Sequence, residues 1–153
     1  MIWSKEFEIE VQKITAANAF SAWLFRFLHD DLLFLNNALD KNEIVFGFIP
    51  AYRKKFHGLG VLAISNKRFL FIKKKIRIEI PIKDFEVYFY ESKRKTFYVR
   101  VGDKTHSFWI FNERISRHFM QRIKQAKKMA ERFQKEMERE NLMRFDFTER
   151  KLT

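Results

Sequence analysis

Between Glu43 and Phe111 the chain repeats short runs rich in Ile, Val, Phe and Tyr, separated by short polar turns. Runs of about four to eight such residues are typical of β-strands, because β-branched and aromatic side chains pack well on a pleated surface. We expect seven strands, at residues 44–49, 58–65, 69–73, 76–82, 86–91, 96–101 and 105–111. Because the connections are short, neighbours along the chain are expected to pair in an antiparallel meander.

The fourth of these runs shows the alternation of a half-buried strand. Its isoleucines occupy every second position and are predicted to share one face: Ile76, Ile78, Ile80 and Ile82. Arg77 and Glu79 are predicted to face the other way. Pro81 has no N–H group, so this end of the strand is expected at a sheet edge or a bend.

Helical periodicity precedes the strands. One apolar face follows the spacing i, i+3, i+4, i+7, i+8 through Phe20, Trp23, Leu24, Phe27 and Leu28. It continues to Leu39, after which Asp40 and Asn42 mark the end of the predicted helix. Residues 3–14 fit a strand period and a helical period equally, and the choice stays open.

A second helix is predicted from Asn112, a suitable N-cap, to the low 140s. A single apolar stripe runs along it: Ile115, Phe119, Ile123, Ala126, Ala130, Phe133 and Met137. We expect this stripe to cover one open face of the sheet. If the helix extends past the sheet, Phe133 and Met137 are exposed for a partner helix or a second copy; the alternative is that Trp23 and Phe27 of the N-terminal helix cover them.

The expected fold class is therefore α+β, mainly β, with one hydrophobic core, since 153 residues suffice for one domain and not for two. We divide the chain into an N-terminal helical extension packed on the core (1–42), a β-domain that includes the C-terminal helix (43–140) and a tail (141–153). The chain has no cysteine, which fits a reducing compartment. Residues 1–10 do not resemble a signal peptide, and charged residues interrupt the most apolar stretch, 16–39, so we expect a cytoplasmic protein with no integral membrane span.

The net charge of +12 is concentrated in the strand region. Residues 43–111 hold 15 Lys and Arg against 6 Asp and Glu, whereas residues 1–42 hold 4 against 6. A positive field of this kind attracts anionic lipid headgroups, acidic protein surfaces or nucleic acid, and charge alone does not choose among them. A coding bias toward Lys and Phe is an alternative origin of part of the excess.

Residues 60–71 read Gly-Val-Leu-Ala-Ile-Ser-Asn-Lys-Arg-Phe-Leu-Phe, and residues 78–85 read Ile-Glu-Ile-Pro-Ile-Lys-Asp-Phe. This order of strand, turn and strand resembles the bacterial pleckstrin-homology (PH) domain family, YokE-like in type, over residues 40–130. Glu43 and the long final helix also match, and Ser65 stands where that family usually has Thr. The resemblance implies a seven-stranded roll of two nearly orthogonal sheets capped by the C-terminal helix. It implies no enzymatic activity; some relatives bind phosphoinositides and others serve in oligomerisation or as scaffolds.

Basic residues gather in the first, third and fifth connections between the expected strands. Each connection holds three: Arg53, Lys54 and Lys55; Lys73, Lys74 and Lys75; and Lys93, Arg94 and Lys95. Alternate connections of a meander emerge at the same end, so these nine residues are predicted to form one anion-binding rim. The alternative is that they are ordinary solvated turn residues, which also discourage aggregation.

No arrangement of catalytic residues is evident. The histidines His29, His57, His106 and His118 have no metal-ligand spacing, and the pair Asp30-Asp31 has no accompanying base or nucleophile. We therefore expect no enzyme, metal or cofactor, and interpret the chain as a binding or scaffold module for an anionic membrane surface or an acidic protein, peripheral to the membrane in the first case. A self-associating homo-oligomer is the alternative function, and nucleic-acid binding ranks behind both because no common nucleic-acid-binding motif is present.

Overall fold

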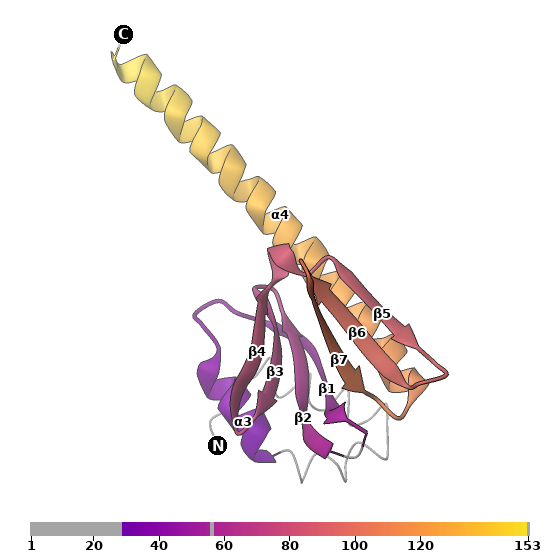
Figure 1. Cartoon of the computed structure of the whole chain (residues 1–153). Coiled ribbons are helices and arrows are strands. Elements are labelled where there is room, and N and C mark those ends of the chain that lie inside the picture. The colour runs from indigo at the N-terminus through magenta and orange to yellow at the C-terminus, as the bar shows by residue number, and fades with distance from the viewer. Residues whose placement is uncertain (1–28, 56, 153) are drawn as a thin grey trace.

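The computed structural model describes residues 29–55 and 57–152 (Figure 1). The expectations for residues 3–14 and for the helical face at residues 20–28 lie outside the described residues.

The described chain contains seven strands between two helices (Figure 1). The elements in chain order are α3 (His29–Ala38), β1 (Val45–Lys54), β2 (His57–Ser65), β3 (Arg68–Lys73), β4 (Lys75–Pro81), a short 3-10 helix η1 (Ile82–Asp84), β5 (Val87–Glu91), β6 (Thr96–Val101), β7 (Lys104–Trp109) and α4 (Glu113–Leu152). The mainly β α+β class is confirmed, and all seven predicted strands are present. The largest difference is β1, which continues past Pro50 to Lys54.

The seven strands form one open antiparallel sheet in the order β4-β3-β2-β1-β7-β6-β5. The chain therefore makes two meanders, β1 to β4 and β5 to β7, and β1 joins them by pairing with β7 at Tyr52 and Trp109. A single meander would have paired β4 with β5. Instead Pro81 ends β4 at the sheet edge, as expected of a residue without an N–H group, and η1 carries the chain to the opposite edge.

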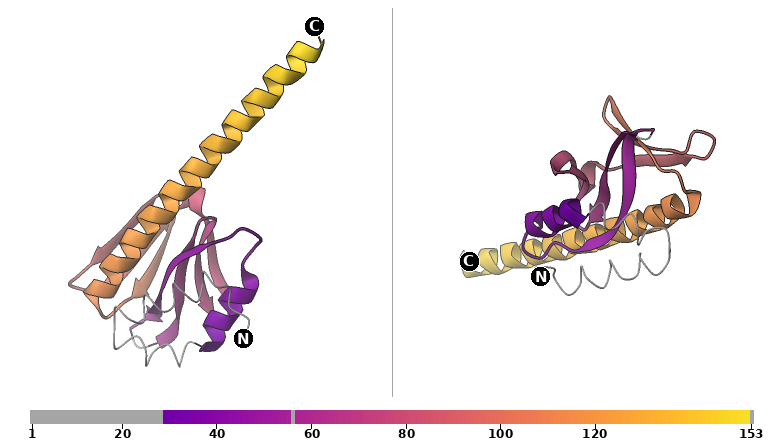
Figure 2. Two further views of the ribbon diagram at one scale, coloured as in Figure 1. Left: turned by 180° about the vertical axis from the view of Figure 1, so that it is seen from behind. Right: turned by 90° about the horizontal axis from the view of Figure 1, so that it is seen from below.

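Each face of the first meander packs against a helix, as Figure 2 shows. On one face α4 contacts β1 and β2 and covers the larger core, whose fully buried rings include Phe69, Phe97 and Phe119. On the other face Leu32 and Leu35 of α3 are fully buried against β2 and β3. Burial on both faces explains why β2 is a continuous apolar run rather than an alternating one.

A β-bulge in β4 corrects the predicted alternation of its isoleucines. Phe71 pairs with Ile78 and the next residue, Ile72, pairs with Ile76, so Arg77 is an extra residue without a partner position in β3. An extra residue reverses the faces on either side of it. Ile78 consequently packs with the α4-facing core, whereas Ile76 packs with the α3-facing core. The prediction that Ile76 shares a face with the other isoleucines is wrong.

Helix α4 starts where predicted, after Asn112, and runs as one helix to Leu152, through the segment predicted to be a separate tail. It lies close against β1: a Cβ atom on Gly47 would approach the Arg122 side chain to 2.9 Å. The helix then continues well past the edge of the sheet (Figure 1). The predicted stripe is thus divided, with Ile123 and Ala126 buried and Phe133 and Met137 exposed.

Candidate anion-binding cleft

A basic cleft of about 620 Å³ lies where the β1–β2 and β5–β6 turns approach each other. Ten residues line it: Arg53, Lys54, Lys55, Lys93, Arg94, Lys95, Thr96, Ser107, Phe108 and Trp109. Six of these side chains are basic, and none of the lining residues is acidic. The structure therefore gathers two of the three basic connections named from the sequence.

Backbone hydrogen bonds hold the β5–β6 turn against the end of β7. Lys95, with a positive φ of 50°, donates its N–H to the Ser92 carbonyl at 3.3 Å and accepts the Ile110 N–H at 2.8 Å. The Thr96 hydroxyl donates to the Arg94 carbonyl at 2.8 Å. The ammonium groups of this turn are thus carried on a backbone tied to the adjacent strand.

Arg53 lies between the cleft and the core. Its guanidinium carbon is 5.2 Å from the centre of the buried Phe108 ring, and its Nη1 donates to the Ser107 carbonyl at 3.5 Å. A cation over an aromatic face is held by the ring quadrupole, which restrains the side chain without neutralising its charge. Its positive charge therefore remains available to an anion in the cleft.

Burial and nearby positive charge both act on the neighbouring His106. Its pKa is lowered from the ordinary 6.5, first by burial and then by the charges of Arg53 and Lys104. Both causes disfavour the imidazolium form. Glu91 forms an ion pair with one residue of the cleft: its carboxylate is 3.7 Å from Nε of Arg94, and both side chains are substantially exposed. One exposed ion pair of this kind offsets little of the positive charge of the six basic residues.

The third basic connection, Lys73–Lys75, lies elsewhere. These residues are not among those lining the cleft, and Figure 1 shows the β3–β4 turn beside α3. The buried Asp31 accepts the Lys74 N–H at 2.6 Å, which ties this turn to α3. Asp31 therefore links the N-terminal extension to the sheet.

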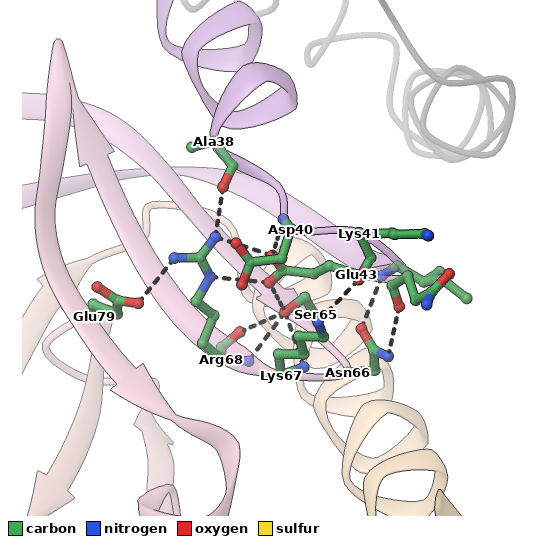
Figure 3. Close-up of polar contacts among 11 residues, drawn as sticks. Ala38, Asp40, Lys41, Glu43, Ser65, Asn66, Lys67, Arg68 and Glu79 are labelled. Atoms are coloured by element: carbon green, nitrogen blue, oxygen red, sulfur yellow. Dashed lines mark hydrogen bonds and ion pairs between the residues drawn. The ribbon is translucent and has the colours of Figure 1, made fainter.

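A second polar cluster is centred on Glu43 and Arg68 (Figure 3). The contact between these two residues was not predicted from the sequence. The Arg68 guanidinium donates to both carboxylate oxygens of Glu43, at 3.0 Å through Nε and 2.9 Å through Nη2. It also donates to the Ala38 carbonyl at 2.7 Å and to Glu79 at 2.9 Å. One side chain thus joins the end of α3, the entry to β1, and strands β3 and β4.

The residues of the motif at 65–68 complete this cluster. The Ser65 hydroxyl donates to Glu43 at 2.5 Å and accepts the N–H groups of Lys67 and Arg68 at 3.1 and 3.0 Å. The Asn66 side chain accepts from the Ile44 N–H at 2.8 Å and donates to the Asn42 carbonyl at 3.2 Å. The signal available in the sequence was Glu43 ahead of the first strand together with an Arg three residues after a turn serine.

Glu43 is held ionised by this cluster. Burial alone would raise its pKa, but hydrogen bonds from Arg68 and Ser65 outweigh burial and lower the pKa below the ordinary 4.5. Hydrogen bonds to Glu43 and then to Glu79 raise the pKa of Arg68. With every oxygen occupied by protein donors, the pair supports the fold rather than offering a ligand site.

The fold and the cleft together define a class: an α+β domain, mainly β, with a basic concave surface built by two hairpin turns and the end of β1. Comparison with models of protein families found no match. Comparison with curated proteins found none either. Within residues 29–55 and 57–152, no helix is both long and apolar enough to cross a membrane, and no cluster of three or more potential metal-ligating side chains occurs.

Proposed function

We propose that this domain is a non-catalytic, PH-like binding module that holds an anionic group in the cleft between the β1–β2 and β5–β6 turns. The observation that carries this proposal is that six basic side chains, from segments about 40 residues apart, line one cleft with no acidic residue among them. Bringing like charges together costs free energy, and a bound anion offsets that cost.

We favour a phosphate-bearing membrane surface as the ligand. The six basic residues lie at the end of β1 and on the two turns at this end of the sheet, a geometry suited to contact with a plane of headgroups. Each basic residue near an anionic bilayer contributes about 1 kcal/mol, so several acting together produce peripheral binding that weakens with salt. An acidic protein surface is the other ligand of matching charge.

The experiment compares two charge-reversal pairs in vesicle sedimentation. Lys54→Glu with Lys93→Glu changes the cleft, and Lys73→Glu with Lys75→Glu makes the same change in net charge at the turn outside it. With vesicles of phosphatidylserine and phosphatidylcholine, we expect the cleft pair to weaken binding at least about tenfold and the control pair to have a much smaller effect.

Equal losses in the two pairs would show attraction by net charge alone and would contradict the cleft. The absence of binding to phosphatidylserine vesicles at low salt would remove the membrane proposal. Circular dichroism of both variants verifies that each remains folded.

A further inference from the structure

The apolar stripe of α4 continues past the sheet that covers its first half. Ile115, Phe119, Ile123 and Ala126 are buried, and the same face then carries Met129, Phe133 and Met137. These three side chains are 43%, 64% and 49% exposed. Exposing a regular stripe of large apolar side chains on a helix is unfavourable in water and marks an interaction surface.

A groove flanks the stripe on each side, where α4 leaves the sheet. One groove, of about 460 Å³, lies between Phe46 of β1 and the helix. The other, of about 750 Å³, lies between the helix and residues near Ile44, Asn66 and Ile82. Met129 and Phe133 line both grooves, so the stripe forms a ridge between them. Helices pack by fitting the ridge of one into a groove of the other.

Charge is distributed unequally along this part of the helix. Residues 124–132 hold Lys124, Lys127, Lys128 and Arg132 against Glu131 alone. Residues 134–142 hold Glu136, Glu138 and Glu140 against Lys135 and Arg139. The walls of the larger groove add three lysines beside the basic part, Lys41, Lys67 and Lys83, against one acidic residue, Glu86. The acidic part thus lies beyond the sheet and the basic part beside it.

We propose that two copies of this chain associate through α4 in antiparallel orientation, centred on Phe133. The antiparallel orientation sets the acidic part of each helix against the basic part and the lysine-bearing groove of the other. A parallel pair would place the basic parts and both lysine-bearing grooves together, which is repulsive. Because Met129 and Met137 are equally spaced about Phe133, the antiparallel pair also sets Met129 of one copy beside Met137 of the second.

The first test uses Phe133→Asp in the full chain, with Leu142→Asp as the matched control. The Leu142 side chain is 65% exposed, almost the same as Phe133, but lies nine residues further along, which is half a turn out of phase with the stripe. In analytical ultracentrifugation we expect Phe133→Asp to weaken the dimer about a hundredfold, because each copy loses a buried ring and gains a carboxylate in an apolar contact. Leu142→Asp is expected to leave the dimer intact.

Either of two results would overturn the dimer: a monomer at all concentrations in low and high salt, or equal effects of the two variants. A third result would also overturn the dimer. If the chain is a monomer and Phe133→Asp lowers its melting temperature, residues 1–28 of the same chain cover the stripe.

A spin label tests the orientation of the two helices. The chain has no cysteine, so one introduced cysteine is labelled specifically. A label at Asn141→Cys lies eight residues from the centre, so two labels in the antiparallel dimer are separated by about 24 Å along the helix axis. In a parallel dimer they would be about 10 Å apart, the spacing of packed helices. Pulsed electron–electron double resonance distinguishes the two distances between the labels. A label separation of about 10 Å would rule out the antiparallel arrangement.

Discussion

At the scale of single residues, Arg68 makes contacts that no neighbouring residue duplicates. Its guanidinium satisfies both oxygens of a buried carboxylate and also reaches a helix carbonyl and a second strand. A buried ion pair contributes little to net stability relative to a well-packed apolar pair, but removing one partner strands a charge in a poorly solvated site. The consequence of a substitution therefore depends on whether Glu43 is left ionised and alone.

We expect Arg68→Met to lower the free energy of unfolding by about 3–5 kcal/mol, because Glu43 then remains buried without its partner. Urea denaturation measures the change. The double variant Glu43→Leu with Arg68→Met is expected to recover part of the loss, since it removes the stranded charge.

Arg77→Met is the matched control for that variant. Arg77 lies in the same β3–β4 hairpin but is exposed, and surface substitutions usually change stability by less than about 0.5 kcal/mol. A loss at Arg77 as large as that at Arg68 would show that the hairpin responds to charge or propensity rather than to the buried pair.

At the scale of elements, the start of α4 decides how the stripe meets the sheet. The Asn112 side-chain oxygen accepts the N–H groups of Arg114 and Ile115 at 2.8 and 3.4 Å, which satisfies donors that the first turn of a helix leaves free. Ile115, in the same turn, is buried in the core. The cap therefore sets the helix rotation that buries Ile115.

We expect Asn112→Ala to destabilise the domain by about 1 kcal/mol through loss of this cap. Asn112→Asp is expected to be nearly neutral, because a carboxylate accepts the same bonds and is favoured at the positive end of the helix dipole. Thermal denaturation of the two variants provides the comparison, and similar losses in both would exclude the cap as the cause.

At the scale of the whole molecule, burial and the distribution of charge couple stability to pH. The pKa values of His106 and His118 are lowered from 6.5, first by burial and then by nearby Arg and Lys charges. The unfolded chain therefore binds protons at a higher pH than the folded chain does at these two sites. Glu43, with its lowered pKa, acts in the same direction at more acidic pH.

We expect the free energy of unfolding to fall as pH is lowered from about 7.5 to about 5.5, since stability from a lowered histidine pKa is complete above the unfolded value and is lost through the folded value. Urea denaturation at several pH values measures this slope. The double variant His106→Gln with His118→Gln should flatten it in this window and leave a further loss below pH 4.5, where Glu43 titrates. A slope unchanged by that double variant would contradict the assignment.

Several features of the fold were determined by the sequence itself. The seven strands, the N-cap at Asn112 and the stripe of α4 follow from local periodicity, because side-chain direction repeats every second residue in a strand and every 3.6 residues in a helix. The end of β4 at Pro81 follows equally from a missing N–H group. Each of these signals acts within a few residues of the chain and needs no distant partner.

The tertiary structure decided the remainder. The pairing of β1 with β7 brought the β5–β6 turn beside the end of β1, whereas the Lys73–Lys75 turn lies outside the cleft. The pairing of β2 with both β1 and β3 brought Arg68 to Glu43, 25 residues away. The bulge at Arg77 turned Ile76 to the opposite face. These outcomes depend on strand order, on register and on the packing of α3 against the sheet. Contacts between distant segments set all three, so no periodic pattern in the sequence predicts them.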